Sequence, residues 1–390
     1  MNFNFDEIID RSNSDCSKIE NLKTLFGSEK LIPLWVADMD FKSPPAITKA
    51  LMERVEHGLF GYTIQSDEYF NSIVNWLDRK HNWKVKREDI NFVPGVVKGF
   101  CFAIEEFSEK GDNIIIQPPV YHPFSLVTKA LGRTVVDNQL ILEDGQYKMD
   151  FDGLRKIIAE KECKMLILCN PHNPGGRVWL TEELRELAQI CYENDIFVVS
   201  DEIHSDMTLP GFKHTPFATV SSEAENNSIT LMAPSKTFNI AGIVSSFAVI
   251  TNKEIRGKYL NFIKPRGLDE GTLFGYTATK VAFTECDDWL DQMLTYIKGN
   301  VDYVDKFLKE NIPGIQAILP EASFLIWLDC RKLNLNHRDL VKLFVNKAGL
   351  ALNDGSTFGP GGEGFMRLNV GTSRKILEKA MSNLKDACNI

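Results

Sequence analysis

The sequence lacks the features that place a chain in a membrane or outside the cell. No apolar run approaches the roughly 18 to 20 residues that a membrane helix needs. The N-terminal stretch MNFNFDEIIDRSNSD shows neither the charged nor the apolar block of a secretory signal. None of the eight cysteines forms a CxxC pair, and a disulfide scaffold is unusual in 390 residues without an export signal. We therefore expect reduced thiols, a cytoplasmic location and no membrane contact.

Positive charge and metal-binding clusters are also scarce. The chain has 44 lysines and arginines against 53 aspartates and glutamates, which gives a formal net charge of -9. A nucleic-acid partner would call for a basic face, so we expect none. The seven histidines are scattered, and His204 with Asp206 alone is a poor ligand set, so we also expect no metal site.

Short apolar runs alternate along the chain with segments of helical spacing. Four runs have continuous rather than alternating apolar residues, which is typical of parallel strands covered on both faces. Strand, helix, strand in this order predicts an α/β fold with right-handed crossovers. The predicted strands are Asn113 to Gln117, Lys164 to Asn170, Ile196 to Glu202 and Ser228 to Pro234, and the predicted helices are Phe151 to Glu160 and Thr181 to Asn194.

The pattern changes near residue 285. A long helical stretch from Asp287 to Glu310 comes first, and strands are predicted near 315–319, 324–328 and 365–370, with helices at 337–347 and from Ser373 onward. This predicts a smaller α+β domain. We expect a large cofactor-binding domain at residues 45–285 and a small domain built from residues 1–44 and 286–390.

Two charged residues stand at the ends of predicted strands. Lys236, in APSKTFNIAG, follows one strand, and Asp201 ends another, IFVVSDE. Alone, Lys236 is better read as a solvated turn residue and Asp201 as a helix cap or an ion-pair partner. However, the carboxyl ends of parallel strands are where open α/β sheets place their ligands. A buried carboxylate there calls for a cationic partner, and a protonated ring nitrogen of a cofactor would be one.

Three further segments follow strands in the same way. The loop NPHNPGG would let Asn173 bond to a ligand oxygen, and alone it is only a tight turn. In VPGVVKGF, a strand, a Pro-Gly turn and a helix from Val96 would aim free amides at a phosphate, although one such turn is weak evidence. In PPVYHPF, Tyr121 could stack on a flat cofactor or simply pack in the core. Together the five features indicate one shared site.

With these residues the sequence resembles the aspartate-aminotransferase (fold type I) family of pyridoxal-phosphate enzymes. The order Asn173, Asp201, Lys236 and Arg367 matches that family's pattern. Within the family it is most similar to the carbon–sulfur lyases of the cystathionine β-lyase type. The similar segments include PLWVADMDF, FGYT, PGVVKGF, NPHNPGGRVW, SDEIHSD, APSKTFNIAG, ASFLIWLDCR and FMRLNVG. The resemblance implies a large domain with a mostly parallel sheet and a smaller α+β domain.

The resemblance also implies a role for each matching residue. Lys236 would hold pyridoxal 5'-phosphate as a Schiff base and act as the general base, and Tyr121 would stack on the ring and share in catalysis. Arg367 would bind the α-carboxylate of an amino-acid substrate. A homodimer is implied because Tyr62 would reach the phosphate bound by the neighbouring subunit. The remaining cofactor-binding residues would be Val96, Val97, Asn173, Asp201, His204 and Ser235.

Some positions depart from the aminotransferase pattern. Ala233 and Val244 stand where aminotransferases often have a serine and an arginine for the phosphate, and His204 stands where many relatives have tyrosine. We therefore expect a β-lyase that converts cystathionine or a related cysteine S-conjugate to a thiol, pyruvate and ammonia. The main alternative is an aminotransferase with the same site. A binding or regulatory protein that keeps the fold without the chemistry is a third hypothesis.

Overall fold

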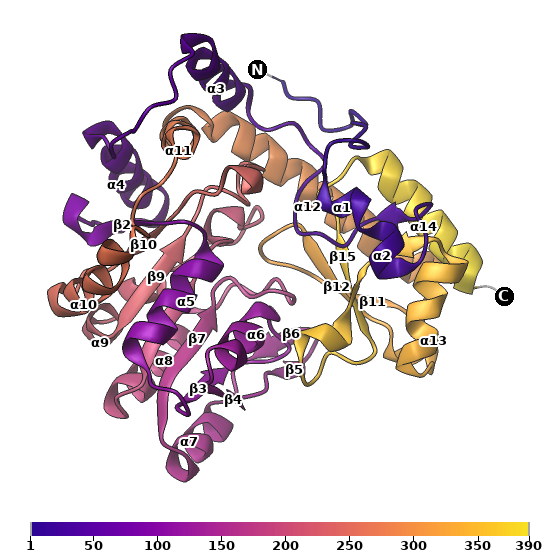
Figure 1. The fold of residues 1–390 in the computed structure, drawn as a ribbon. Helices are drawn as coiled ribbons and strands as arrows, with labels where there is room; N and C mark the ends of the chain where they lie inside the picture. The colour runs from indigo at the N-terminus through magenta and orange to yellow at the C-terminus, as the bar shows by residue number, and fades with distance from the viewer. Residues whose placement is uncertain (1, 389–390) are drawn as a thin grey trace.

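The computed structural model describes residues 2–388, which fold around two main β-sheets, one of seven strands and one of four. Figure 1 shows the larger sheet in magenta tones and the smaller one in orange and yellow, side by side. No helix in the described part of the chain is long and apolar enough to cross a membrane. All eight cysteines are free thiols.

The seven-stranded sheet confirms the four predicted strands to within two residues. Its order is β2-β10-β9-β8-β7-β3-β4, and only β10 runs antiparallel to its neighbours. The antiparallel strand was not predicted, because a continuous apolar run indicates burial on both faces but not direction. The strands are β2 (Ile90–Val93), β10 (Ser246–Val249), β9 (Ser228–Met232), β8 (Phe197–Asp201), β7 (Cys163–Cys169), β3 (Asn113–Ile116) and β4 (Thr134–Asp137).

Helices cover both faces of this sheet. Successive residues of β7 enter opposite cores: Met165 and Ile167 face one, Leu166 and Leu168 the other. This two-residue alternation of buried side chains explains why the strand reads as one apolar run. One face is covered by α5 (Val96–Phe107), α6 (Pro123–Ala130) and α10 (Lys253–Ile263), the other by α7 (Phe151–Glu160), α8 (Thr181–Glu193) and α9 (Ser222–Asn226).

The four-stranded sheet is antiparallel, with the order β11-β12-β15-β14. Its strands are β11 (Gln316–Ile318), β12 (Leu325–Asp329), β15 (Phe365–Asn369) and β14 (Asn353–Asp354). The predicted helices of this region are confirmed as α12 (Asp287–Asn311), α13 (His337–Lys342) and α14 (Arg374–Cys388). The helix predicted at 337–347 changes after Lys342 into a wider π turn.

Three more helices pack together beside the larger sheet. They are α3 (Pro45–His57), α4 (Asp67–His81) and α11 (Leu273–Glu285), and α11 contacts both of the others. The short hairpin of β5 (Ile141–Glu143) and β6 (Gln146–Lys148) follows β4.

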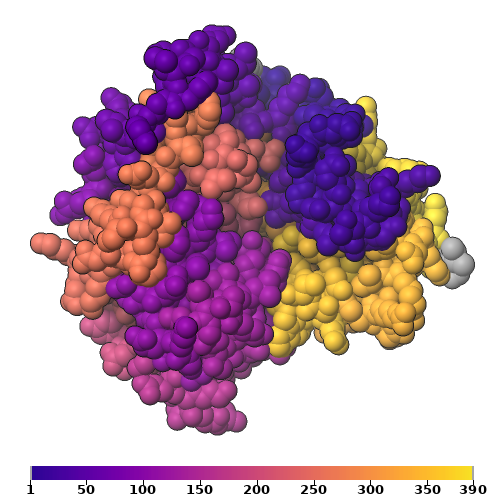
Figure 2. All heavy atoms as spheres, viewed as in Figure 1, coloured from indigo at the N-terminus to yellow at the C-terminus, as the bar shows by residue number. Residues whose placement is uncertain are grey.

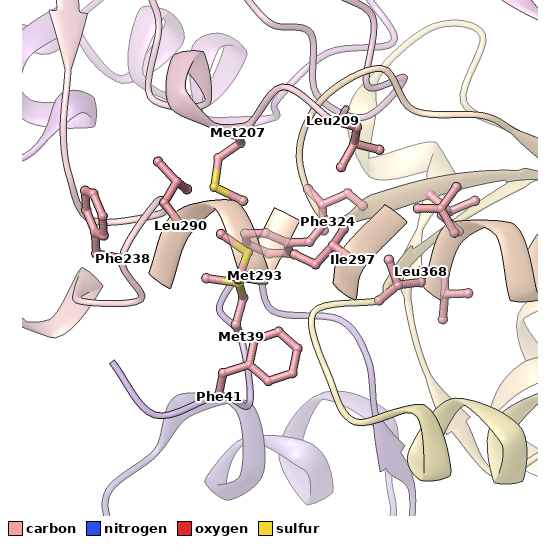
Figure 3. Packing of buried hydrophobic residues seen from close by; sticks show 14 of the residues in the cluster. Met39, Phe41, Met207, Leu209, Phe238, Leu290, Met293, Ile297, Phe324 and Leu368 are labelled. Atoms are coloured by element: carbon pink, nitrogen blue, oxygen red, sulfur yellow. The ribbon is translucent and has the colours of Figure 1, made fainter. Parts of the chain in front are cut away.

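The N-terminal segment packs on the C-terminal part of the chain. After α1 (Ser17–Glu20) and α2 (Leu22–Phe26), β1 (Ile32–Pro33) pairs in parallel with β13 (Leu350–Ala351). Figure 2 shows this indigo segment lying against the yellow C-terminal residues. Figure 3 shows Met39 and Phe41 beside Met293, in the cluster of buried apolar residues that includes Phe324 and Leu368. Residues 35–40 therefore lie between the two sheets.

Candidate active site

Five strand ends of the larger sheet and two strands of the smaller sheet, β14 and β15, meet at a cavity of about 490 Å³, which Asn353 of β14 also lines. β2, β3, β7, β8 and β9 each run into a loop or helix that reaches this cavity, and β15 contributes Arg367 from the other side. The structure thus brings together all but one of the site residues predicted from the sequence. Those lining the cavity are Val96, Val97, Tyr121, Asn173, Asp201, His204, Ser235, Lys236 and Arg367.

Lys236 stands four residues after the end of β9. Its Nζ donates a hydrogen bond to the carbonyl oxygen of Ala37 at 2.7 Å. Burial, and then the nearby Arg367 cation, lower the pKa of Lys236 to about 8, while Asp38 and Asp201 act in the opposite direction. An amine with this pKa is partly neutral near pH 7, so it can act as a nucleophile or as a base.

Asp201 is the last residue of β8 and is almost fully buried. Its Oδ1 accepts a hydrogen bond from the backbone N–H of Ile203 at 3.1 Å. Burial raises the pKa of Asp201 to about 7, and the charge of Glu202 adds to this, whereas Ile203 and Lys236 oppose it. The ionised form of this carboxyl is costly to bury, so a cation placed beside it would stabilise the ionised form.

His204 follows Asp201 on the same loop and is buried. Burial lowers the pKa of His204 to about 3, with Lys236 and Arg367 contributing, so the ring is neutral at pH 7. Within residues 2–388 its Nδ1 has no hydrogen-bond partner. Buried polar atoms are usually partnered, so this nitrogen marks a position where a ligand atom would be stabilised.

Arg367 is buried and is held by neutral groups. Its Nη1 donates to Oδ1 of Asn173 at 3.1 Å, and its Nη2 donates to the carbonyl oxygen of Trp35 at 2.9 Å and to Oδ1 of Asn353 at 2.5 Å. The guanidinium also lies 5.1 Å from the ring centre of Phe358. Burial lowers the pKa of Arg367 to about 10, which keeps it charged at pH 7. This cation is fixed in place, and its neutral partners leave the charge for an anionic ligand.

A phosphate-sized anion fits at the start of α5. Gly95, which precedes the helix, has φ of +116°, a conformation that side-chain-bearing residues rarely adopt. The first amides of a helix have no intrahelical acceptor, so those of Val96 and Val97 are available at the cavity wall. The hydroxyl-bearing residue Ser235 lines the same cavity.

The donor set fits the pyridoxal phosphate that the sequence predicts. Lys236 offers the amine, Asp201 an anionic partner for a ring nitrogen, the α5 amides a phosphate site, and His204 an unpartnered nitrogen. Tyr121 supplies an aromatic ring at the same wall, and burial, with a further contribution from Asp201, raises its pKa to about 12. Each chemical part of the cofactor therefore has a matching group in one cavity.

Tyr62 is the predicted site residue that the structure does not bring to the cavity. It is fully exposed, at 110% of its reference surface, on the segment between α3 and α4. Leu59, Phe60 and Ile64 on the same segment are also exposed, at 68%, 59% and 80%. The segment therefore offers an apolar surface away from the cavity of its own chain.

Sequence reasoning missed several residues of the cavity wall. Trp35 and Ala37 provide carbonyl acceptors for Arg367 and Lys236, and Asn353 fixes Arg367 from β14. Cys169 and His122 also line the cavity. The segment PLWVADMDF was noticed only as a similar stretch, because backbone carbonyls carry no signal in a sequence.

Comparisons with known proteins give one consistent result. A family model described as aminotransferase class I and II matches residues 29–384. Cystathionine beta-lyase PatB of Bacillus subtilis is 41% identical over 98% of this chain and 99% of its own length. Two crystal structures are similar over nearly the full length of both chains. Cystalysin from Treponema denticola, which contains pyridoxal 5'-phosphate, has a TM-score of 0.96 at 34% identity, covering 100% of this chain and 99% of its own. The PLP-bound C-S lyase from Staphylococcus hominis has a TM-score of 0.93 at 32% identity, covering 99% and 98%.

Proposed function

Because the chain belongs to the aminotransferase class I and II family, we propose that it is a pyridoxal-phosphate-dependent carbon–sulfur β-lyase. Its substrates are L-cystathionine or related cysteine S-conjugates, and its products are a thiol, pyruvate and ammonia. The expected fold, that of the fold type I pyridoxal-phosphate enzymes, is confirmed by the family match and by the TM-scores. The main support for this function is that Lys236, Asp201 and Arg367 line one cavity. The chain is also similar to C–S lyases over nearly its full length.

Each charged group of the cavity has a separate task in this proposal. Pyridoxal phosphate, when bound, supplies an aldehyde that joins an amine and a ring that withdraws electrons from the substrate's α-carbon. Arg367 binds the α-carboxylate of the substrate with its two-pronged donor face. Asp201 keeps the ring nitrogen protonated. Val96, Val97 and Ser235 would hold the phosphate, and Asn173 and His204 would bind the ring's phenolic oxygen.

Lys236 has two successive roles. Its Nζ would hold the aldehyde of the bound cofactor, and the same amine would serve as the base that removes the substrate's α-proton. The lowered pKa of Lys236, about 8, suits this base because about a tenth of the amine is neutral near pH 7, far more than for an ordinary lysine. Loss of the α-proton allows the β-carbon to release a thiolate, which Tyr121, or Tyr62 of the partner subunit, would protonate. The remaining three-carbon enamine hydrolyses to pyruvate and ammonia.

Turnover without a keto acid tests this function against the aminotransferase alternative. Incubation with L-cystathionine alone should release pyruvate and thiol over many turnovers, whereas an aminotransferase would stop after about one. Lys236→Ala should abolish pyruvate formation, and Lys253→Ala, an exposed lysine on α10, serves as the control. Borohydride reduction followed by peptide mapping should tag Lys236. A tag on another lysine, or pyruvate formation by Lys236→Ala at the wild-type rate, would reject the assignment.

A homodimer in which Tyr62 reaches the partner's cofactor completes the proposal. It is supported by the exposed apolar residues Leu59, Phe60, Tyr62 and Ile64, since exposed patches of this kind mark interaction sites. Light scattering should give twice the chain mass for the wild type, and Ile64→Asp should shift it toward the monomer. Tyr62→Phe should leave the dimer intact and weaken cofactor binding. A wild-type monomer that retains full lyase activity would contradict this part.

Two further assignments follow from the same reasoning. We place the enzyme in the cytoplasm, supported by its eight free thiols, and fractionation of cells would test this. We also propose that residues 45–285 form a cofactor-binding domain and that residues 1–44 and 286–390 form a smaller one. The seven-stranded sheet lies wholly within the first range and the four-stranded sheet within the second. Hydrogen exchange with and without a substrate analogue should show the two parts changing as separate units.

A further inference from the structure

Residues 35–40, here called the strap, contact both functional cations of the cavity through backbone carbonyls. The carbonyl oxygen of Trp35 accepts from Nη2 of Arg367 at 2.9 Å, and that of Ala37 accepts from Nζ of Lys236 at 2.7 Å. These two acceptors are two residues apart on the same short segment. A displacement of the strap would therefore move the acceptors of both cations together.

Two asparagines fasten the strap to the two sheets. Asn369, at the end of β15, donates from Nδ2 to the carbonyl oxygens of Val36 and Asp38, both at 2.6 Å. Asn239, three residues after Lys236, accepts from the Met39 N–H at 3.0 Å and donates to the Met39 carbonyl at 2.9 Å. The strap is thus fixed to the elements that carry Arg367 and Lys236.

A cluster of four charges lies on the strap's outer side, formed by Arg11, Lys18, Asp38 and Asp40. The Lys18 side chain is completely buried, and its Nζ lies 2.9 Å from Asp40 and 3.5 Å from Asp38. Arg11, which is 23% exposed, lies 2.7 Å from Asp38 and 2.8 Å from Asp40. The alternate residues Met39 and Phe41 point into the apolar core instead, as Figure 3 shows.

Burial of the charged Lys18 side chain costs free energy, which its ion pairs must offset. Removing an ammonium group from water costs several kcal/mol, so such residues are rare unless they are paired. Exposed pairs of the same segment, such as Lys23 with Glu29 at 74% and 69% exposure, carry no such cost. Lys18 also holds the strap through its backbone, because its carbonyl oxygen accepts from Nε1 of Trp35 at 3.0 Å.

One charge of the cluster, that of Asp38, acts on the amine of Lys236. That amine faces Arg367 from β15, Asp201 from β8, His204 and Tyr121 from the neighbouring loops, and Asp38 from the strap. Asp38 is the member of the cluster that acts on it directly, since its negative charge favours the protonated amine. Lys18 and Arg11 offset that negative charge, because they lie 3.5 and 2.7 Å from the Asp38 carboxylate.

We propose that Lys18 and Arg11 are positioning residues for Lys236: they hold the strap in place and limit the negative charge that Asp38 presents to the amine. This proposal rests on the assignment of Lys236 as the reacting amine. Removal of either cation leaves Asp38 less compensated, so Lys236 retains its proton to higher pH. Neutralisation of Asp38 has the opposite effect.

Competitive labelling of the cofactor-free protein measures this directly. The rate at which a small acylating reagent modifies Lys236, followed by mass spectrometry over a range of pH, gives the midpoint at which the amine loses its proton. For Lys18→Met we expect that midpoint to rise by about 0.5 or more. Lys18→Arg keeps the charge and should restore the wild-type value. The matched control Lys23→Met, on α2, should leave it unchanged.

Two further variants keep the test decisive if Lys18→Met fails to fold. Arg11→Met removes a less buried cation and should raise the midpoint, while Asp38→Asn should lower it. A purely structural cluster would lower the melting temperature in these variants and leave the midpoint of Lys236 at the wild-type value. That result in Arg11→Met and Asp38→Asn overturns the proposal.

The absorbance of the bound cofactor gives a second measure of the Lys236 midpoint. Together with pyruvate formation, it allows the positioning role and the lyase function to fail independently. In wild-type holoenzyme its pH-dependence should follow Lys236, and in Arg11→Met the transition should move to higher pH. If the wild type binds cofactor and releases pyruvate while no variant moves the labelling midpoint, the positioning role fails and the lyase stands. If the midpoints move as expected but the wild type forms no pyruvate, the lyase assignment fails and the positioning role stands.

Discussion

Asp201 and Glu202 are adjacent carboxylates, both buried, whose surroundings differ completely. Glu202 has no exposed surface and accepts hydrogen bonds from Ser200, Asn170 and Phe217 at 2.8, 3.3 and 2.8 Å. Its other oxygen lies 2.7 Å from Nε2 of His214. Asp201, which is 4% exposed, accepts one bond, from the Ile203 N–H.

The difference separates a carboxylate that stabilises the fold from one that serves a ligand. A buried charge with several donors is accommodated by the protein itself, whereas one with a single donor costs free energy until a cation arrives. Residue alternation places the two on opposite faces of the strand end, so only Asp201 reaches the cavity. Four experiments on three variants test this difference.

Asp201→Asn should have the largest effect, and it should fall on catalysis. The amide keeps the size and the Ile203 hydrogen bond but cannot hold a ring nitrogen protonated. We expect kcat to fall about 10²- to 10³-fold, as on removal of one preorganised electrostatic group. The melting temperature of the cofactor-free protein should not fall. Pyruvate assays and calorimetry would check this, and a variant with near-wild-type kcat would contradict the role of Asp201.

Glu202→Gln should show the reverse profile. The amide places a donor group where one carboxylate oxygen accepts, so the buried network around His214 loses a charge-assisted bond. We expect a loss of about 2–3 kcal/mol in the free energy of unfolding, with kcat per folded molecule largely retained. Denaturant unfolding measures the first and active-site titration the second. A stable variant with a collapsed kcat would place Glu202 in the chemistry instead.

The sequence alone could not separate these two residues. It indicates that SDE closes a buried strand, and the carboxyl end of a parallel strand indicates a ligand site, so Asp201 was predictable from pattern and resemblance. The partners of Glu202, however, come from Asn170, His214 and Phe217, whose proximity depends on tertiary packing. The strap was missed for the same reason, because the acceptors for Lys236 and Arg367 are backbone carbonyls. The strands that were predicted are confirmed in position, whereas β4 and the antiparallel β10 were not predicted.

Arg177 and Arg367 extend the comparison to cations. Arg177 is buried with two carboxylates, Glu321 at 2.7 Å and Glu183 at 3.1 Å, whereas the hydrogen bonds of Arg367 go to neutral oxygens. Arg367→Lys keeps the charge but loses the two-pronged geometry. We expect KM to rise roughly 10- to 100-fold, the equivalent of one or two charge-assisted hydrogen bonds. Steady-state kinetics would show it, and an unchanged KM would mean that the substrate carboxylate binds elsewhere.

The pH-dependence of stability gives the most specific test. In the unfolded chain Asp201 loses its proton near pH 3.8, but in the folded, cofactor-free protein its pKa is about 7. Between these values the folded state binds more protons than the unfolded state, so the contribution of Asp201 to stability decreases as the pH rises. Asp201→Asn removes this dependence. Its advantage over the wild type should therefore grow by about 2–3 kcal/mol between pH 5 and pH 8.

The sign of this change distinguishes Asp201 from Lys236, another group at the same cavity whose pKa is perturbed. The pKa of Lys236 is lowered to about 8, so its contribution to stability rises with pH above 8 and is nearly constant below it. Denaturant unfolding of cofactor-free wild type and Asp201→Asn, restricted to pH 5–8, thus isolates the carboxyl group. An equal pH-dependence in both proteins would mean that Asp201 is already compensated by the protein, as Glu202 is, and would remove the physical reason for placing a cationic ring nitrogen beside it.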